Sequence, residues 1–63
     1  MPHVQITLLE GRSAEQKRRI AERITQILVE EGGARREAVS VAFLDVPETD
    51  FARAGVLIAD RNR

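Results

Sequence analysis

The stretch that decides the fold is PHVQITLLEGRSAEQK, which spans residues 2–17. Its first half alternates apolar and polar side chains, and this period of two predicts a β-strand over residues 2–9 with one buried face. Ser13 is followed three residues later by Gln16, which is the spacing of a helix capping box. The stretch therefore predicts a strand, a short loop and a helix that begins at Ala14.

A long amphipathic helix is predicted downstream of this start. Apolar residues that recur at helical spacing define the face expected to pack on a sheet: Ile20, Ala21, Ile24, Ile27 and Leu28. Charged residues fill the remaining surface, and Glu15 is placed to pair with Arg19 one turn later. Gly32 and Gly33 end the helix, because glycine adopts the left-handed conformation needed just past a helix C-terminus. We expect a helix of about 18 residues, which is about 27 Å long.

The second half of the chain predicts one more long strand. Residues 39–46 are apolar or β-branched at both alternating positions, which is typical of a strand covered on both faces. Pro47 ends this strand, and residues 48–50 predict a turn. Residues 51–58 then predict a loop or a short hairpin, and residues 60–63 form a polar tail.

Strand, helix and strand in this order form one βαβ unit, so the predicted fold class is α/β with parallel strands and a right-handed crossover. A chain of this length buries only about 60% of the surface that its unfolded form exposes. It has no cysteine for disulfides, and its single histidine, His3, lacks partners at metal-ligand spacing. Oligomerisation is the remaining source of stability. We therefore expect one domain over residues 1–63, completed by another subunit on the sheet face that carries Leu9, Ala42 and Leu44.

The charge balance argues against several classes of partner. Ten Lys and Arg residues offset ten Asp and Glu residues, so there is no net charge to attract nucleic acid or an anionic membrane. No apolar run approaches the roughly 20 residues of a membrane span, and the N-terminus lacks the build of a signal peptide. We expect a cytoplasmic protein without nucleic-acid or membrane partners.

Three features stand together along the chain: the start Met1-Pro2, the run GRSAEQK over residues 11–17 after the first strand, and Phe51 after a polar turn. Together they resemble the 4-oxalocrotonate tautomerase family of the tautomerase superfamily, over nearly the whole length. The resemblance implies a hexamer built as a trimer of dimers, and an enzyme that needs no cofactor or metal. It implies that Pro2, freed by removal of Met1, is the catalytic base. It also implies that Arg12 of a neighbouring subunit binds a substrate carboxylate and that Phe51 forms an apolar wall.

The sequence departs from the family pattern at Ser40. The family has a second active-site arginine in the middle of the second strand, and Ser40 aligns with that position. A serine cannot offer a carboxylate the charged, forked donor that an arginine offers. We therefore keep open the hypothesis that Arg53 or Arg36 partly replaces the missing arginine.

The chemistry needs a base that is unprotonated near neutral pH. Catalytic efficiency peaks when the pKa of the base lies close to the working pH. We expect removal from water beside Phe51, and nearby arginines, to lower the pKa of the Pro2 amine. Arg12 would stabilise the negative charge that develops as an enolate forms. The predicted reaction is keto-enol tautomerisation of a 2-oxo acid enol, such as 2-hydroxymuconate or phenylenolpyruvate.

Two other functions remain as alternatives. The first is a non-catalytic subunit, or one partner of a hetero-hexamer whose sister chain supplies the missing arginine. The second is another proline-dependent reaction, such as hydration with dehalogenation, which needs an extra carboxylate to activate water. Glu10, Asp45 and Glu48 are not convincingly placed for that task. Taken alone, His3 is interpreted as a structural residue and Ser40 as a strand residue with no catalytic part. Ser40 stays a possible substrate-binding residue, together with Arg53 and Arg36.

Overall fold

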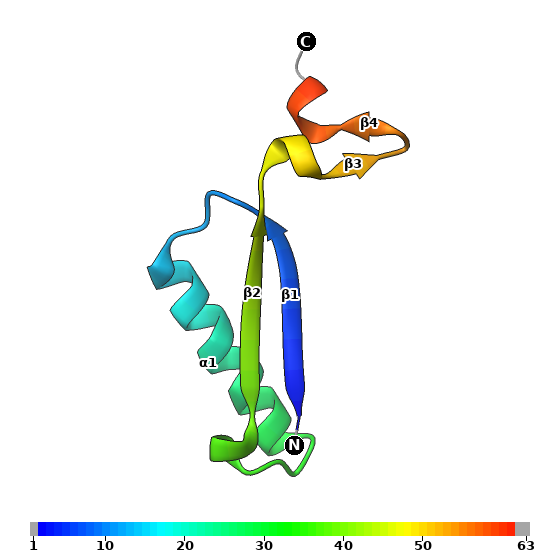
Figure 1. The fold of residues 1–63 in the computed structure, drawn as a ribbon. Coiled ribbons are helices and arrows are strands. Elements are labelled where there is room, and N and C mark those ends of the chain that lie inside the picture. The colour runs from blue at the N-terminus through cyan, green and yellow to red at the C-terminus, as the bar shows by residue number, and fades with distance from the viewer. Residues whose placement is uncertain (1, 62–63) are drawn as a thin grey trace.

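A parallel pair of strands and the helix between them form the main part of the molecule (Figure 1). The computed structural model describes residues 2–61. Strand β1 spans His3–Leu9, helix α1 spans Ala14–Glu30 and strand β2 spans Ser40–Val46. The two strands lie side by side, and α1 lies along one face of the pair. The α/β prediction is confirmed, and each strand starts one residue later than the sequence predicted.

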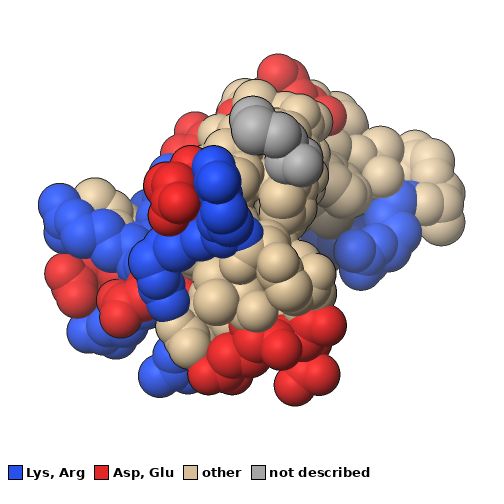
Figure 2. Space-filling view, turned by 90° about the horizontal axis from the view of Figure 1, so that it is seen from below, with Lys and Arg blue, Asp and Glu red and all other residues tan. Residues whose placement is uncertain are grey.

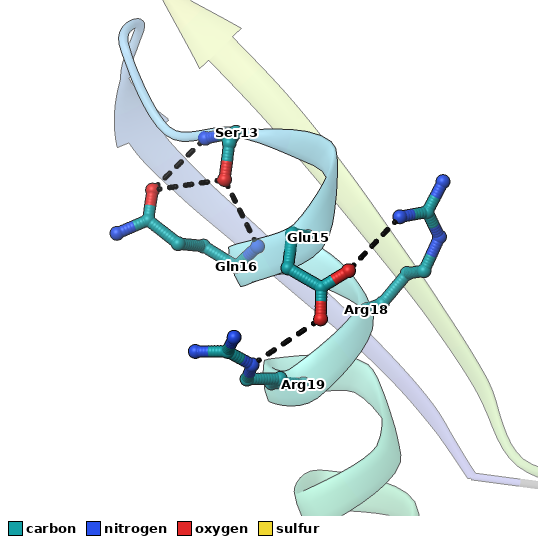
Figure 3. Close-up of polar contacts among 5 residues, drawn as sticks. All are labelled: Ser13, Glu15, Gln16, Arg18 and Arg19. Carbon is teal, nitrogen blue, oxygen red and sulfur yellow. Dashed lines mark hydrogen bonds and ion pairs between the residues drawn. The ribbon is translucent and has the colours of Figure 1, made fainter.

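The start of α1 is held by the predicted capping box (Figure 3). The Ser13 hydroxyl accepts a hydrogen bond from the Gln16 backbone N–H at 3.1 Å, and Gln16 Oε1 accepts one from the Ser13 backbone N–H at 2.9 Å. Glu15 pairs with Arg18 and with Arg19, each at 3.3 Å. Both predictions for this turn are confirmed, because they depend only on residues one turn apart.

Glycine ends the helix as predicted. Gly33 has a φ of +67°, which an L side chain rarely adopts, and the Ala34 N–H donates to the Leu28 carbonyl at 3.1 Å. A Cβ on Gly32 would lie only 2.8 Å from the Leu28 carbonyl oxygen. The chain therefore leaves the helix after Glu30 through two positions where a larger residue is strained.

The strand register assigns the side chains of the sheet to two faces. His3 is paired with Ser40 and Leu9 with Val46, and the residues between them pair one to one in sequence order. The carboxylate of Asp45 accepts a 2.7 Å bond from Lys17 Nζ of α1, so its face is the one that α1 covers. Alternation then assigns positions 4, 6, 8, 41, 43 and 45 to the helix face, and positions 3, 5, 7, 40, 42 and 44 to the opposite face.

The predicted packing face of α1 is only partly correct. Ala21, Ile24 and Leu28 are half-buried, as expected. Ile20 and Ile27 are not covered by the sheet, because 36% and 57% of their surfaces remain exposed. Two strands form a sheet too narrow to cover a wide apolar stripe, so this outer pair, seven residues apart, is left on the surface.

The described part of the chain has no closed core of its own. None of the residues from 2 to 61 is fully buried, and Leu44 on the open sheet face is 46% exposed. The accessible surface is 4988 Å², against about 4100 Å² expected for a folded monomer of this mass. The radius of gyration is 15.0 Å, against about 11 Å for a compact chain of this length. An isolated parallel pair of strands is also unusual, because parallel sheets are normally covered on both faces.

A small hairpin follows β2. Strand β3, Ala52–Arg53, pairs antiparallel with strand β4, Val56–Leu57. The two residues between them, Ala54 and Gly55, have φ values of +54° and +80°, as in a type I′ turn. The segment predicted as a loop or short hairpin is a hairpin, and it projects beyond the end of the sheet (Figure 1).

Three short 3₁₀ turns join these elements. They are Arg36–Ala38 before β2, Glu48–Asp50 after β2 and Ile58–Asp60 after β4. The second coincides with the predicted turn. The other two were not predicted, since a single 3₁₀ turn is too short to produce a periodic pattern.

Candidate functional site

Pro2 lies directly before β1, at the end of the sheet where both parallel strands begin. It is half-buried, and its carbonyl accepts a hydrogen bond from the Ser40 backbone N–H at 3.1 Å. Proline has no N–H to contribute to a strand ladder, so this carbonyl bond is the one that ties Pro2 to the start of β2. The first residue after Met1 is thus fixed beside Ser40.

Ser40 forms a side-chain contact that the sequence interpretation missed. Its hydroxyl lies 2.7 Å from His3 Nδ1, and both side chains are exposed on the sheet face opposite α1. The sequence predicts a structural role for His3 and a possible substrate-binding role for Ser40, and it predicts no contact between them. The signal for their contact is the register of a parallel βαβ unit, in which the first residues of both strands stand opposite each other.

Arg36 lies at the same end, in the turn before β2. Its guanidinium donates to Gln26 Oε1 of α1, and Gln26 Nε2 in turn donates to Glu30 at 2.5 Å. The neighbouring Arg35 pairs with Glu37 at 3.5 Å. The two cations next to β2 are therefore each held by groups of their own chain.

Arg12, Phe51 and Arg53 lie at the opposite end of the sheet. Arg12 is exposed in the loop between β1 and α1, and it forms no hydrogen bond or ion pair with residues 2–61. Phe51 is half-buried where the chain enters the hairpin. Arg53 is exposed in β3, and its carbonyl accepts a bond from Arg61 at 3.3 Å.

One chain does not bring the predicted site residues together. The seven residues of β1 separate Pro2 from the Arg12 loop, which is a span of about 20 Å. The chain start and the loop after β1 lie at opposite ends of the sheet (Figure 1). Pro2, Ser40 and the Arg36 turn form one group, which we call the proline end; Arg12, Phe51 and Arg53 form the other.

An open hollow adjoins the Arg12 loop. Its lining residues follow β1 and β2 directly or belong to the second and third 3₁₀ turns: Glu10, Gly11, Pro47, Glu48, Thr49 and Ala59. Two of the three carboxylates considered for activating water, Glu10 and Glu48, line it. The third, Asp45, is engaged by Lys17 on the helix face.

Charges of both signs share the surface at the proline end. Figure 2 views the molecule from this end, and basic and acidic side chains lie interleaved there. Among residues 2–61, no helix is both long enough and apolar enough to cross a membrane.

Comparison with known proteins decides the family. A family model described as "Tautomerase enzyme" matches residues 2–61. The chain belongs to the tautomerase family. This tautomerase is 44% identical over 63 residues to the 2-hydroxymuconate tautomerase of Comamonas testosteroni, with both chains covered completely. The resemblance inferred from the Met1-Pro2 start and the GRSAEQK run is confirmed.

Two solved structures show the same fold. A 4-oxalocrotonate tautomerase isozyme from Methylibium petroleiphilum matches with a TM-score of 0.90 and 42% identity, covering 98% of this chain and 100% of that chain. A heterohexamer 4-oxalocrotonate tautomerase from Chloroflexus aurantiacus matches with a TM-score of 0.90 and 30% identity, covering 97% of this chain and 98% of that chain. This tautomerase is an isomerase that interconverts keto and enol forms.

Proposed function

We propose that the chain is a cofactor-independent tautomerase for enols of 2-oxo acids, with Pro2 as general base once Met1 is removed. The observation that carries this proposal is the position of Pro2. Its carbonyl is held by Ser40 while its nitrogen needs no partner in the sheet. Loss of Met1 turns this nitrogen from an amide into a secondary amine at the end of an ordered strand. The likeness to the 2-hydroxymuconate tautomerase of Comamonas testosteroni supports a 2-hydroxymuconate-like substrate. A phenylenolpyruvate-like substrate is part of the same proposal.

The reaction moves one proton from oxygen to carbon. The neutral amine of Pro2 accepts the proton of the enol hydroxyl, and the C–O bond becomes a carbonyl. The electron pair of the former C=C bond then takes a proton from the prolyl ammonium at carbon, which regenerates the amine. A positioned base of this kind accelerates a reaction by about 10² to 10⁴-fold.

The proposed site is shared between chains. Arg12 stands about 20 Å from Pro2 of its own chain and has no partner among residues 2–61, so it is available to a neighbour. In this arrangement Arg12 of a second copy binds the substrate carboxylate and stabilises the developing enolate. Phe51 supplies an apolar wall, and Arg53 on the same end is the better placed of the two cations considered for a supporting role, because Arg36 is engaged by Gln26.

An oligomer of this single-domain chain, residues 1–63, is part of the proposal. The large accessible surface, the open sheet face with Leu44 and the exposed Ile27 all leave apolar area for other subunits. The assembly we propose is a homo-hexamer of the kind implied by the family resemblance. A cytoplasmic location belongs to the same proposal.

Two measurements test the base. Intact-mass spectrometry of the purified chain is expected to show loss of Met1. The ultraviolet absorbance of 2-hydroxymuconate or phenylenolpyruvate then reports ketonisation, and Pro2→Ala is expected to lower kcat by at least about 10²-fold. Equal rates for the wild type and Pro2→Ala would disprove the proposed mechanism.

A mixing experiment tests the shared site. Pro2→Ala and Arg12→Ala are each expected to be inactive as pure oligomers. Unfolding and refolding the two together produces mixed oligomers, in which some sites combine an intact Pro2 with an intact Arg12. Recovery of activity in the mixture supports a site built from two chains, whereas no recovery beyond the sum of the parents contradicts it.

A second candidate function is a subunit of a hetero-hexamer. The structural likeness to the heterohexamer of Chloroflexus aurantiacus favours it, together with Ser40 at the position of the expected arginine. In that case a sister chain supplies the missing group. Native mass spectrometry and assay of this chain by itself separate the two functions, because a homo-oligomer with Pro2-dependent turnover is incompatible with an obligatory partner.

A further inference from the structure

The loop that carries Arg12 is tied to β2 on both of its sides. Before the loop, the Glu10 backbone N–H donates to the Val46 carbonyl at 2.9 Å. After the loop, Lys17 Nζ in the first turn of α1 donates to Asp45 Oδ2 at 2.7 Å. Asp45 and Val46 are consecutive residues of β2, so the segment between the two ties is closed, with Arg12 on it.

We propose that the ion pair of Lys17 and Asp45 is a positioning element for Arg12. It holds the Arg12 loop in the conformation that presents the guanidinium to the substrate carboxylate of a neighbouring chain. Lys17 and Asp45 act through Arg12 and do not contact the substrate. The inference rests on the proposed function of Pro2 and Arg12.

Packing does not hold the Arg12 loop in place. Arg12 is exposed, and a Cβ added to Gly11 would meet no heavy atom of the described residues within 4 Å, its chain neighbours aside. Gly11 has a φ of +121°, which glycine adopts at no steric cost, so the backbone turns sharply between the two ties. A loop with so few contacts has a low local stability, and its conformation therefore depends on the polar ties beside it.

The two ties differ in what they fix. The capping box of Ser13 and Gln16 joins residues of the same turn, so it sets the start of α1 without setting where the helix stands on the sheet. Lys17 and Asp45 are 28 positions apart. Among residues 2–61, their contact is the only hydrogen bond or ion pair between α1 and the strands β1 and β2. It therefore places the first turn of α1, and the loop before it, relative to β2.

The same contact leaves Arg12 as the free cation of this region. Arg18 and Arg19 both pair with Glu15 (Figure 3), and Lys17 is paired with the sheet. Of the four cations in the loop and the first two turns of α1, Arg12 alone has no hydrogen bond or ion pair within the described residues. A substrate carboxylate at this end therefore meets one unpaired guanidinium.

The partial exposure of the ion pair limits the size of its effect. The side chains of Lys17 and Asp45 are 24% and 42% exposed, so water and salt screen their attraction. A contact shifts an equilibrium between loop conformations only by its own contribution to the difference between them. For a pair of this kind, the shift is a factor of about two to five.

The test compares an acid substrate with its neutral ester, on the assembled protein with Met1 removed. Phenylenolpyruvate carries a carboxylate, whereas its methyl ester cannot accept the charge-assisted bonds that a guanidinium donates to a carboxylate. The ratio of the two kcat/KM values, which we call the acid-to-ester ratio, reports how well Arg12 binds the carboxylate. Asp45→Asn and Lys17→Met are each expected to lower this ratio about two- to fivefold, mainly through the KM of the acid.

Two further variants serve as matched controls. Lys17→Arg keeps the charge at position 17 and is expected to keep the wild-type ratio. Glu15→Gln removes two ion pairs of the same helix that do not reach the sheet, so it is also expected to leave the ratio unchanged. A merely structural role for the ion pair lowers kcat/KM of the acid and of the ester by the same factor. An unchanged ratio in Asp45→Asn or in Lys17→Met therefore overturns the inference.

The inference and the proposed function fail differently. Absence of any turnover that depends on Pro2, with either substrate, disproves the proposed function and the inference with it. A ratio that Arg12→Ala leaves unchanged disproves the proposed role of Arg12. A ratio that Arg12→Ala lowers and Asp45→Asn does not lower overturns only the role of the ion pair. If Asp45→Asn fails to assemble, as judged by its sedimentation coefficient, Lys17→Met and its control Lys17→Arg decide the question.

Discussion

Replacement of Leu44 by aspartate tests whether the open sheet face is an interface. Leu44 is 46% exposed in the single chain, on the face that α1 does not cover. Full burial of a leucine contributes about 2 kcal/mol, so covering the remaining half contributes about 1 kcal/mol per copy, or about 6 kcal/mol across the six copies of the proposed hexamer. An aspartate there loses this gain, and burying its unpaired carboxylate costs several kcal/mol more per subunit. Every 1.4 kcal/mol is tenfold in an equilibrium constant, so we expect Leu44→Asp to dissociate the assembly.

Sedimentation velocity over a range of protein concentrations measures this outcome, with thermal unfolding followed by circular dichroism in parallel. The wild type is expected to sediment as an oligomer with a concentration-dependent Tm. Leu44→Met keeps the volume and the apolar character of the side chain and is expected to stay assembled. If Leu44→Asp sediments like the wild type with an unchanged Tm, the open face is not an interface and the reasoning from exposed area is wrong.

Three further predictions concern the single chain. Ser13→Ala removes the hydroxyl that accepts the hydrogen bond of the Gln16 N–H, and it is expected to lower the free energy of unfolding by about 1 kcal/mol, measured by chemical denaturation. Ser13→Thr keeps the hydroxyl and is expected to lower this free energy less; equal losses would exclude the cap as the cause. Ala54 has a φ of +54°, a conformation that asparagine adopts at a lower energy cost than alanine, so Ala54→Asn is expected to stabilise the hairpin by about 1 kcal/mol. Slower amide exchange in β3 and β4 measures this gain, and unchanged exchange refutes the strain argument. Asp45→Asn breaks the partly exposed ion pair with Lys17 and is expected to lower the free energy of unfolding by about 0.5 to 1 kcal/mol at low ionic strength, and by less in about 1 M salt. A loss that does not depend on salt would indicate a packing effect instead.

The candidate site was predictable in part. The Met1-Pro2 start and the GRSAEQK run identified the family, and comparison with known proteins confirmed it. The roles of Pro2, Arg12 and Phe51 stay proposals. The contact between His3 and Ser40 was not predicted, because it joins residues 37 positions apart and depends on the strand register. The engagement of Arg36 by Gln26 was missed for a similar reason, since it depends on how the turn before β2 folds back on α1.

The sequence by itself determined the local elements of this protein. Alternation predicted the first strand, and an apolar and β-branched run predicted the second. The spacing from Ser13 to Gln16 predicted the helix start, and Gly32 and Gly33 predicted the helix end, because each of these signals depends on residues a few positions apart. Only the tertiary structure decided which surfaces are left without cover. The narrow sheet leaves Ile27 exposed, and the length of β1 holds Pro2 and Arg12 at opposite ends of one chain. The exposure of a surface and the distance between two residues depend on how distant segments of the chain pair, so the periodicity of a single segment does not predict them.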